Sequence, residues 1–364
     1  MEVFMRQLMF DVPYRYDDFL KDTDYLLREY PSMLEVHKIG KSEDGRDLLV
    51  FRIGKGEIPV IITVGVHGRE AINPMVVIRA IESYLELVKF NEPLVVDFTM
   101  PERLEPVNPF TRGFLTEIYN QVQNYPYETV NRIPDWIGNV EERFSPRPKG
   151  AEIPTEYHPK QYLKEFSFYI VPLLNPDGYE IALGGFDTIQ TPEYRANAIT
   201  SRIPAEEWKA NARGVDLNRN FPSVTWRPKF LGDQPGSEKE TQALMYLFSV
   251  IPAHGYLDLH SRGKAIYYAK SQMSPEYNER QERIATRLQA VTGYDLMPPE
   301  EEIKAMDSGG NTVHYFSETY QKPAITIETV SDLEPFPLDL RHQRPTFEEI
   351  ALVPFEFTSA LIEE

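Results

Sequence analysis

The chain alternates between two patterns of hydrophobic residues, one typical of buried strands and one typical of amphipathic helices. The strand pattern consists of short runs of β-branched and aliphatic residues bounded by polar or turn residues. It predicts a hairpin at residues 34–54, strands at 58–66 and 166–174, a strand pair at 255–269 and a short strand at 322–330. Turns are expected around Gly45 and at residues 175–178, where Asn-Pro-Asp-Gly favours a change of direction.

The helical pattern, with hydrophobic residues three and four positions apart, fills the segments between these strands. It predicts helices near residues 16–30, 73–88, 236–250, 275–294 and 345–364. Asn73 is expected to cap the second of these, with Pro74 in its first turn, and Ser237 with Glu240 is expected to form a capping box. Because strands and helices alternate, the sequence favours a layered α/β fold.

Residues 101–161 break this alternation. They are rich in proline, aromatic and charged residues, and aromatic side chains such as Phe114 and Trp136 can pack. We therefore expect a long insertion within one domain that spans residues 1–364, rather than a linker. A lid, a specificity wall and a dimer contact all fit this segment, and the sequence predicts no oligomeric state.

Composition narrows the class of protein. The 56 acidic residues exceed the 38 basic ones, so the formal charge of −18 disfavours nucleic acid and anionic membranes as partners, although it leaves room for a local basic pocket. Without cysteine, any metal site must use His, Asp or Glu. No hydrophobic run approaches a membrane span and the first residues lack the pattern of a signal peptide, so a cytoplasmic location is expected.

Two of the seven histidines, His67 and His260, come at the ends of predicted strands, where ligands bind in open α/β sheets. Glu70 lies three positions after His67, so the two side chains can face one way if a turn begins there. Two histidines and a glutamate form the ligand set of a catalytic zinc, with one position left for water. A His-x-x-Glu pair also arises by chance, and a strand-end histidine is often only hydrogen-bonded.

Other stretches favour a functional site over these structural explanations. Residues 208–222 include Asp216, Asn218 and Arg219, and an arginine beside amides can hold a carboxylate through forked hydrogen bonds. Residues 307–311 predict a glycine turn before a helix. Glu328 interrupts a β-branched strand, where a lone carboxylate is costly unless it is paired or functional. Taken singly, the first two could be a solvated loop and a simple turn.

The order of these motifs resembles that of the zinc carboxypeptidases, the carboxypeptidase A-like metallopeptidases, from about residue 15 to the last predicted helix. The matching motifs are His67-Gly-Arg-Glu70, Asn175-Pro-Asp-Gly178, Val215–Asn220, Leu259-His260-Ser261, Ser308-Gly-Gly310 and Glu328. The resemblance implies a central, twisted, mixed eight-stranded sheet with helices on both faces. It also implies one zinc ion and hydrolysis of peptide bonds by metal-activated water.

Roles for individual residues follow from the same resemblance. It implies His67, Glu70 and His260 as zinc ligands, Asp216 as the acid that orients the first zinc histidine, and Glu328 as the general base. The substrate-binding residues that it implies are Arg69, Asn218, Arg219, Ser308, Gly309 and Thr312, with Asn218 and Arg219 gripping the terminal carboxylate. The family's oxyanion arginine aligns near Lys209, a cation that cannot form a fork, and Arg213 is the other candidate for this role.

Residues 208–222 are most similar to the bacterial branch that cleaves γ-D-glutamyl-diaminopimelate bonds in murein peptides. We therefore expect small peptides, murein fragments among them, as substrates that are bound through a free carboxylate. An exopeptidase for ordinary α-linked C-terminal residues stays open, as does a zinc deacylase or amidase. An inactive peptide-binding module with the same fold is a further alternative, but it would be expected to have lost Glu328 or a zinc ligand.

Overall fold

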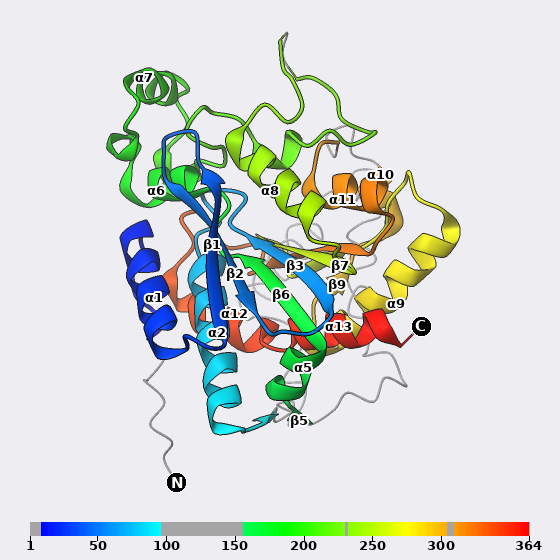
Figure 1. Ribbon diagram of the computed structural model, residues 1–364. Helices are drawn as coiled ribbons and strands as arrows, with labels where there is room; N and C mark the ends of the chain where they lie inside the picture. Colours follow the sequence, from blue (N-terminus) through cyan, green and yellow to red (C-terminus); the bar gives the residue numbers. More distant parts are fainter. Residues whose placement is uncertain (1–8, 96–155, 230–231, 304–308, 364) are drawn as a thin grey trace, which may run out of the picture. The chain divides into compact units, whose positions relative to one another are not determined.

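The computed structural model describes residues 9–95, 156–229, 232–303 and 309–363 (Figure 1). Residues 1–93 and 158–364 form one compact unit and residues 94–157 form a second. The described part of the second unit is an antiparallel pair of short strands, β4 (Leu94–Val95) and β5 (Glu156–Tyr157). Most of the predicted insertion, including Phe114 and Trp136, lies outside the described residues.

An eight-stranded mixed sheet forms the centre of the first unit, which confirms the predicted fold class. Its strands run in the order β1-β2-β6-β3-β7-β10-β8-β9. The four central strands β6, β3, β7 and β10 are parallel, and β1, β2 and β8 add antiparallel pairs. The strands are β1 (Leu34–Lys41), β2 (Asp47–Ile53), β3 (Ile58–Val64), β6 (Phe166–Val171), β7 (Gly255–Ser261), β8 (Ala265–Tyr267), β9 (Asp295–Leu296) and β10 (Ala324–Thr329).

Helices cover both faces of this sheet, as expected for strands that are buried on both sides (Figure 1). On one face, α8 packs on β1, and α11 packs on β7 and β10; on the other, α2 packs on β3 and β7, and α9 packs on β8 and β10. The longer helices are α1 (Tyr16–Glu29), α2 (Asn73–Phe90), α5 (Pro159–Glu165), α6 (Pro176–Gly184), α7 (Pro192–Thr200), α8 (Lys239–Val250), α9 (Pro275–Thr292), α11 (Thr312–Tyr320), α12 (Gln343–Ile350) and α13 (Val353–Ile362). Shorter turns are α10 (Pro299–Ile303), η2 (Phe186–Thr188), η3 (Ala205–Glu207), η4 (Leu217–Arg219) and η5 (Leu340–His342).

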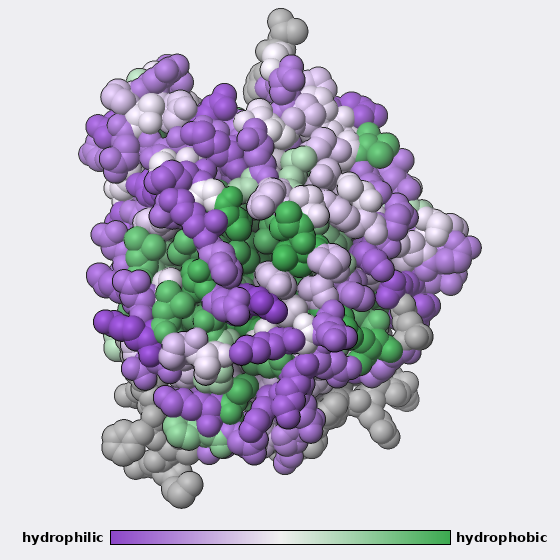
Figure 2. Space-filling view, viewed as in Figure 1, coloured by the Kyte–Doolittle hydropathy of each residue, from purple (hydrophilic) through white to green (hydrophobic). Residues whose placement is uncertain are grey.

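The core between the sheet and α8 with α11 is rich in aromatic rings. The Phe248 ring of α8 contacts Tyr256 of β7 edge-on at 4.9 Å and Phe316 of α11 at 5.0 Å between centroids. Edge-to-face pairs of this kind add to the hydrophobic gain of burying the rings. Hydrophilic residues cover most of the face seen in Figure 2, and hydrophobic ones show chiefly over its middle. Among the described helices, none combines the length and hydrophobicity that crossing a bilayer would need.

Two predicted helix starts are wrong, because the expected capping side chains have other partners. The N-cap of α2 is Ile72, not Asn73, whose side chain donates to the carbonyl of His260. Glu238 is the N-cap of α8, and the expected capping box is absent, because the Ser237 hydroxyl donates to Glu238 (2.6 Å) and Glu240 accepts from the backbone N–H of Glu43 (3.0 Å).

Two other predictions gave the wrong type or number of elements. The Asn175–Gly178 segment begins α6 instead of forming an isolated turn: Asn175 is the N-cap and accepts from Gly178 N–H at 2.8 Å, with Pro176 following as the first helical residue. Asparagine and proline are helix-start signals as well as turn signals. The single helix expected at 345–364 is two helices, α12 and α13, with Pro354 in the first turn of the second.

Candidate metal centre and active site

The candidate site lies at the carboxyl ends of three neighbouring parallel strands. His67 follows β3, His260 is the penultimate residue of β7, and Glu328 is the penultimate residue of β10. In the pairing of β7 with β10, His260 and Glu328 are direct neighbours. Side chains at equivalent positions of adjacent parallel strands point to the same face, so the sheet itself places an imidazole beside a carboxylate.

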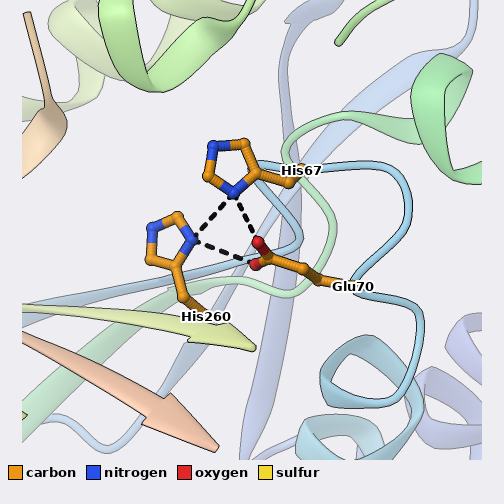
Figure 3. A group of neighbouring side chains, drawn as sticks. All are labelled: His67, Glu70 and His260. Carbon is orange, nitrogen blue, oxygen red and sulfur yellow. Dashed lines mark hydrogen bonds and ion pairs between the residues drawn. The ribbon is translucent and has the colours of Figure 1, made fainter. Parts of the chain in front are cut away.

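The side chains of His67, Glu70 and His260 converge on one point (Figure 3). The two Nδ1 atoms are 3.2 Å apart, His67 Nδ1 is 2.6 Å from Glu70 Oε1, and His260 Nδ1 is 3.0 Å from Glu70 Oε2. Zinc–nitrogen bonds of about 2.0–2.1 Å in a tetrahedron place two ligand atoms about 3.3 Å apart. The spacing of these three side chains therefore fits one divalent ion, and the described residues bring together all three predicted ligands.

An acid lies behind each imidazole, on the side away from this point. His67 Nε2 is 3.3 Å from Asp216 Oδ1, and His260 Nε2 is 3.0 Å from Asp258 Oδ2. A neutral histidine that donates its Nε2–H to a carboxylate keeps its Nδ1 lone pair for a metal. Asp258 orients His260 in this way, whereas Asp216 lies behind His67 at ion-pair distance and His67 Nε2 has no hydrogen-bond partner among the described residues.

Sequence reasoning found Asp216 but missed Asp258. Asp258 is completely buried on β7, and it accepts hydrogen bonds from the hydroxyls of Thr63 (2.6 Å) and Thr312. The available signal was the Asp-x-His spacing, because residues two apart on a strand share one face. The hydrogen bonds that Asp258 accepts explain why its carboxylate can be buried in the middle of the sheet.

The electrostatics of the cluster favour a cation. Burial opposes ionisation of Glu70, but the two imidazoles outweigh it and hold the pKa of Glu70 far below its ordinary value. Burial also disfavours a charged His260, yet the carboxylates of Asp258 and Glu70 raise its pKa well above the usual range. Positive charge at the shared point is therefore stabilised.

Asn73 links the ends of the strands that carry the site. Its Nδ2 donates to the backbone carbonyl of His260 at 2.7 Å, and its Oδ1 accepts from the Thr329 hydroxyl at 2.7 Å. The backbone N–H of Ser261 in turn donates to Glu70 Oε2 at 3.0 Å. The asparagine predicted as a helix cap thus fixes β7 against β10.

The turn from His67 to Glu70 rests on α6. A Cβ on Gly68 would lie 2.2 Å from the carbonyl carbon and oxygen of Gly178, so only glycine fits there without movement. Asn175 Nδ2 donates to the carbonyl of Val66 at 3.0 Å and ties the same turn to the start of α6. The Asn-Pro-Asp-Gly motif therefore supports the turn that carries two of the three converging side chains.

Glu328 has a carboxyl oxygen that is buried without a hydrogen-bond partner. Its Oε2 is buried and has no hydrogen-bond partner among the described residues. Burial, together with the negative charge of Glu70, raises the pKa of Glu328 to about 8, although His260 and Lys209 oppose this shift. A carboxyl group with such a pKa can both take and return a proton near neutral pH.

The structure distinguishes the two candidate oxyanion cations. Lys209 Nζ lies 2.9 Å from Asp216 Oδ2, directly beside the acid that contacts His67. Arg213 instead pairs with Glu238 at 3.2 Å, and Glu43 lies 3.9 Å away. Glu238 is fully buried, so Arg213 is held by a carboxylate that needs a counter-charge.

The predicted carboxylate grip has donors available. Asn218 Oδ1 accepts from the backbone N–H of Thr312 at 3.1 Å, which leaves the Asn218 amide N–H₂ pointing elsewhere. Within the described chain, Arg219 pairs with no carboxylate; its guanidinium donates to the carbonyl of Asn218 at 2.7 Å. Both side chains are half-buried, so they remain accessible to a ligand.

The remaining residues that were predicted to contact the substrate differ in their surroundings: two are packed against other parts of the chain and one lines a cavity. Thr312 is completely buried and its hydroxyl donates to Asp258, so it does not line a substrate pocket. Gly309 packs so closely on the 219–226 loop that a Cβ would lie 2.1 Å from the Thr225 carbonyl oxygen. Ser308 lies outside the described residues. Arg69 is half-buried and lines a cavity of about 440 Å³ together with Lys209 and Trp208.

A mixed α/β sheet that gathers two imidazoles and a carboxylate at its carboxyl edge, beside a second carboxylate with a raised pKa, defines the class of metal-dependent hydrolases. Comparison with known families gives the particular group. The zinc carboxypeptidase family model matches residues 20–98 and 154–332, and the chain belongs to this family. The family is zinc-dependent, and the cluster of His67, Glu70 and His260 is the candidate site for that ion.

Individual relatives agree with this assignment. The chain is 27% identical over 193 residues to the uncharacterized protein YqgT of Bacillus subtilis, which covers 50% of each chain. It is 25% identical over 181 residues to γ-D-glutamyl-L-diamino acid endopeptidase 1 of Lysinibacillus sphaericus, covering 46% of this chain and 43% of the relative. The chain thus spans half or less of the length of these curated relatives.

Among solved structures, thrombin activatable fibrinolysis inhibitor has the same fold. The two structures superpose with a TM-score of 0.65 at 17% sequence identity, over 97% of this chain and 75% of the other. At this level of identity, the likeness concerns the fold alone.

Proposed function

We propose that the protein is a zinc-dependent peptidase that hydrolyses small peptides bearing a free carboxylate on the leaving residue. His67, Glu70 and His260 would hold the ion, with Asp216 and Asp258 orienting the two imidazoles. The observation that carries this proposal is the convergence of two Nδ1 atoms and one carboxylate within 3.2 Å, next to Glu328 on the neighbouring strand. An inactive binding module would not be expected to keep all four side chains.

Zinc bound at this point supplies Lewis acidity and lowers the pKa of a bound water toward neutrality. Glu328 would then act as the proton carrier: its buried Oε2 has no partner among the described residues and its pKa lies near 8. It would take a proton from the attacking water and return it to the leaving amine. Lys209, 2.9 Å from Asp216, would supply positive charge near the developing oxyanion.

Asn218 and Arg219 would bind the carboxylate of the leaving residue. Arg219 has no carboxylate partner within the described ranges, and the Asn218 oxygen is already taken by Thr312 N–H, so both residues present donors. A planar guanidinium beside an amide suits the two oxygens of a carboxylate. This geometry supports a restriction of cleavage to peptides with such a group.

We further propose γ-D-glutamyl-diaminopimelate bonds of murein peptides as the scissile bonds. The similarity to the Lysinibacillus endopeptidase supports this choice. A paired assay tests it, using zinc-loaded protein with L-Ala-γ-D-Glu-diaminopimelate and with N-blocked α-dipeptides that have free C-termini. Cleavage of the first substrate alone is expected, whereas cleavage of the α-dipeptides alone would replace it with ordinary carboxypeptidase action.

A Glu328→Gln variant tests the mechanism. It keeps the shape of the side chain but cannot carry the proton, so turnover should fall by about a thousandfold or more while zinc binding is retained. Metal content by atomic spectroscopy and initial rates by chromatography give the two readouts. Substantial remaining turnover would show that another group is the base.

A further inference from the structure

Two arginines lie against one aromatic ring beside the candidate site. The Cζ atom of Arg69 is 4.5 Å from the centroid of the Phe336 ring, and that of Arg262 is 4.9 Å from the same centroid. The two cations are therefore less than about 10 Å apart. A guanidinium within about 6 Å of a ring centroid is attracted by the ring's quadrupole, so Phe336 holds both groups in place.

Neither arginine forms an ion pair with a carboxylate in the part of the chain that the structure describes. Arg262 donates to the backbone carbonyl of Asp332, and the Nε atom of Arg69 is buried without a hydrogen-bond partner. Several other arginines of this acidic protein that are at least partly buried have acidic partners, among them Arg15, Arg46, Arg79 and Arg287. Arg195 and Arg219, which are also half-buried, donate to backbone carbonyls instead. Two neighbouring cations without a counter-charge repel each other, and a bound anion would relieve that repulsion.

All three residues belong to segments that leave the sheet next to the converging ligands. Arg69 stands between His67 and Glu70, and Arg262 comes two residues after His260. The next residue, Gly263, donates its N–H to the carbonyls of Thr329 (3.2 Å) and Val330 (2.8 Å), directly after Glu328. The arginine pair is thus attached to the same strand ends as the chemistry, whereas Asn218 and Arg219 come from a different loop.

There is room for a ligand next to Arg69. A cavity of about 800 Å³ is lined by Arg69, Ile72, Pro337 and Leu338, immediately after Phe336 in the chain. Glu206 and Asp339 also line it, but neither pairs with Arg69 among the described residues. The cavity therefore offers space for a ligand beside Arg69, whereas Arg262 and the three converging side chains do not line it.

We propose that Arg69 and Arg262 bind a second substrate carboxylate, one that lies on the acyl side of the scissile bond. This inference rests on the proposed function, in which Asn218 and Arg219 already take the carboxylate of the leaving residue. The substrates selected are peptides whose residue before the scissile bond carries a free carboxylate. A glutamyl residue linked through its γ-carboxyl meets this requirement, because its α-carboxylate stays free.

The test uses two substrates that differ only at that carboxylate: L-Ala-γ-D-Glu-diaminopimelate and the same peptide with the glutamyl α-carboxylate converted to an amide. The zinc-loaded enzyme is expected to favour the acid at least tenfold in kcat/KM, because charge-assisted hydrogen bonds to it are lost in the amide. Arg262→Gln should reduce this preference to about twofold or less, chiefly by raising KM for the acid, with little change for the amide.

Arg341→Gln is the matched control. Arg341 is 65% exposed and pairs with Glu334, so its loss removes the same charge from a nearby surface and should leave the preference for the acid intact. Equal cleavage of both peptides by the unmodified enzyme would overturn the proposal. An unchanged preference in Arg262→Gln would overturn it as well.

A binding measurement separates this proposal from the proposed function. The zinc-loaded Glu328→Gln protein and its Arg262→Gln double variant are titrated calorimetrically with both peptides. Tighter binding of the acid that disappears in the double variant would support the second carboxylate site even if the enzyme cleaved neither peptide. Equal affinity for acid and amide would refute the site, whereas absence of turnover alone would refute only the peptidase activity.

Discussion

The buried Glu240 carboxyl should make the stability of the fold depend on pH. Glu240 is completely buried at the start of α8, and burial raises its pKa from 4.5 to about 8, a shift that its hydrogen bond from Glu43 N–H only partly offsets. The folded state thus binds this proton more tightly than the unfolded state. Its contribution to stability is fully present below pH 4.5 and is lost as the pH rises through about 8.

Glu240→Gln removes the titration and keeps the oxygen that accepts from Glu43. The glutamine amide would face Asn211 Nδ2, which donates to the other Glu240 oxygen at 3.3 Å, so the two proteins need not be equal near pH 4.5. From that pH upward the variant should gain about 1.4 kcal/mol for each pH unit up to about pH 8, with an upper limit of about 5 kcal/mol. At about 2.1 cal/mol/K per residue, 364 residues convert this limit into a rise of ~6 °C in Tm.

The assay is thermal unfolding of both proteins, followed by circular dichroism at constant zinc from about pH 5 to about pH 9. Taking the difference between the two proteins cancels the titration of other groups. Glu279→Gln, at an exposed position of α9, is the control and should show no difference that grows with pH. A Glu240→Gln variant whose advantage is the same at both ends of this range would refute the assignment of a buried, protonated carboxyl.

Three further predictions concern the metal centre. Asp258→Asn should weaken zinc binding by about 10- to 100-fold, because the acid no longer orients His260; competition with a chelator measures this, and an unchanged affinity would count against its role. Gly68→Ala should lower both Tm and zinc affinity, since the new Cβ would meet the Gly178 carbonyl at 2.2 Å; wild-type values for both would contradict the close packing. Zinc at about a thousandfold above its Kd should stabilise the fold by about 4 kcal/mol and a chelator should reverse this, and a Tm indifferent to zinc would contradict a site formed only in the folded state.

Much of the fold could be predicted from the sequence because strand and helix periods are strong local signals. Runs of β-branched residues predict β3 and β10, and a short apolar run that ends at His260 predicts β7. The sheet and its flanking helices follow from the alternation of strands and helices together with the family resemblance. Helix ends were less predictable. Asn73, Ser237 and Glu240 have standard capping chemistry, but each is engaged by a residue distant in the chain or by another local partner.

The converging ligands could be predicted because the chain has only seven histidines and because the order of the motifs along the chain is distinctive. Of the two acids behind the imidazoles, Asp216 was predicted through the family resemblance but Asp258 was not. Asp258 and Thr312 meet only when β7 and α11 pack, and a Thr–Asp hydrogen bond across 54 positions leaves no local pattern. The choice between Lys209 and Arg213 likewise depends on tertiary ion pairs, since only the folded chain places Arg213 beside Glu238.

The pairing of His260 with Glu328 across two parallel strands has an evolutionary consequence. His260 and Glu328, the proposed zinc ligand and proton carrier, lie on adjacent central strands and cannot move apart without disrupting the sheet, whereas Lys209, Asn218, Arg219 and the arginines around Phe336 lie outside the strands. Mutation of those segments would therefore change which peptides the proposed site accepts while the proposed hydrolytic residues stay fixed. Divergence of specificity within such a scaffold requires only changes in the loops.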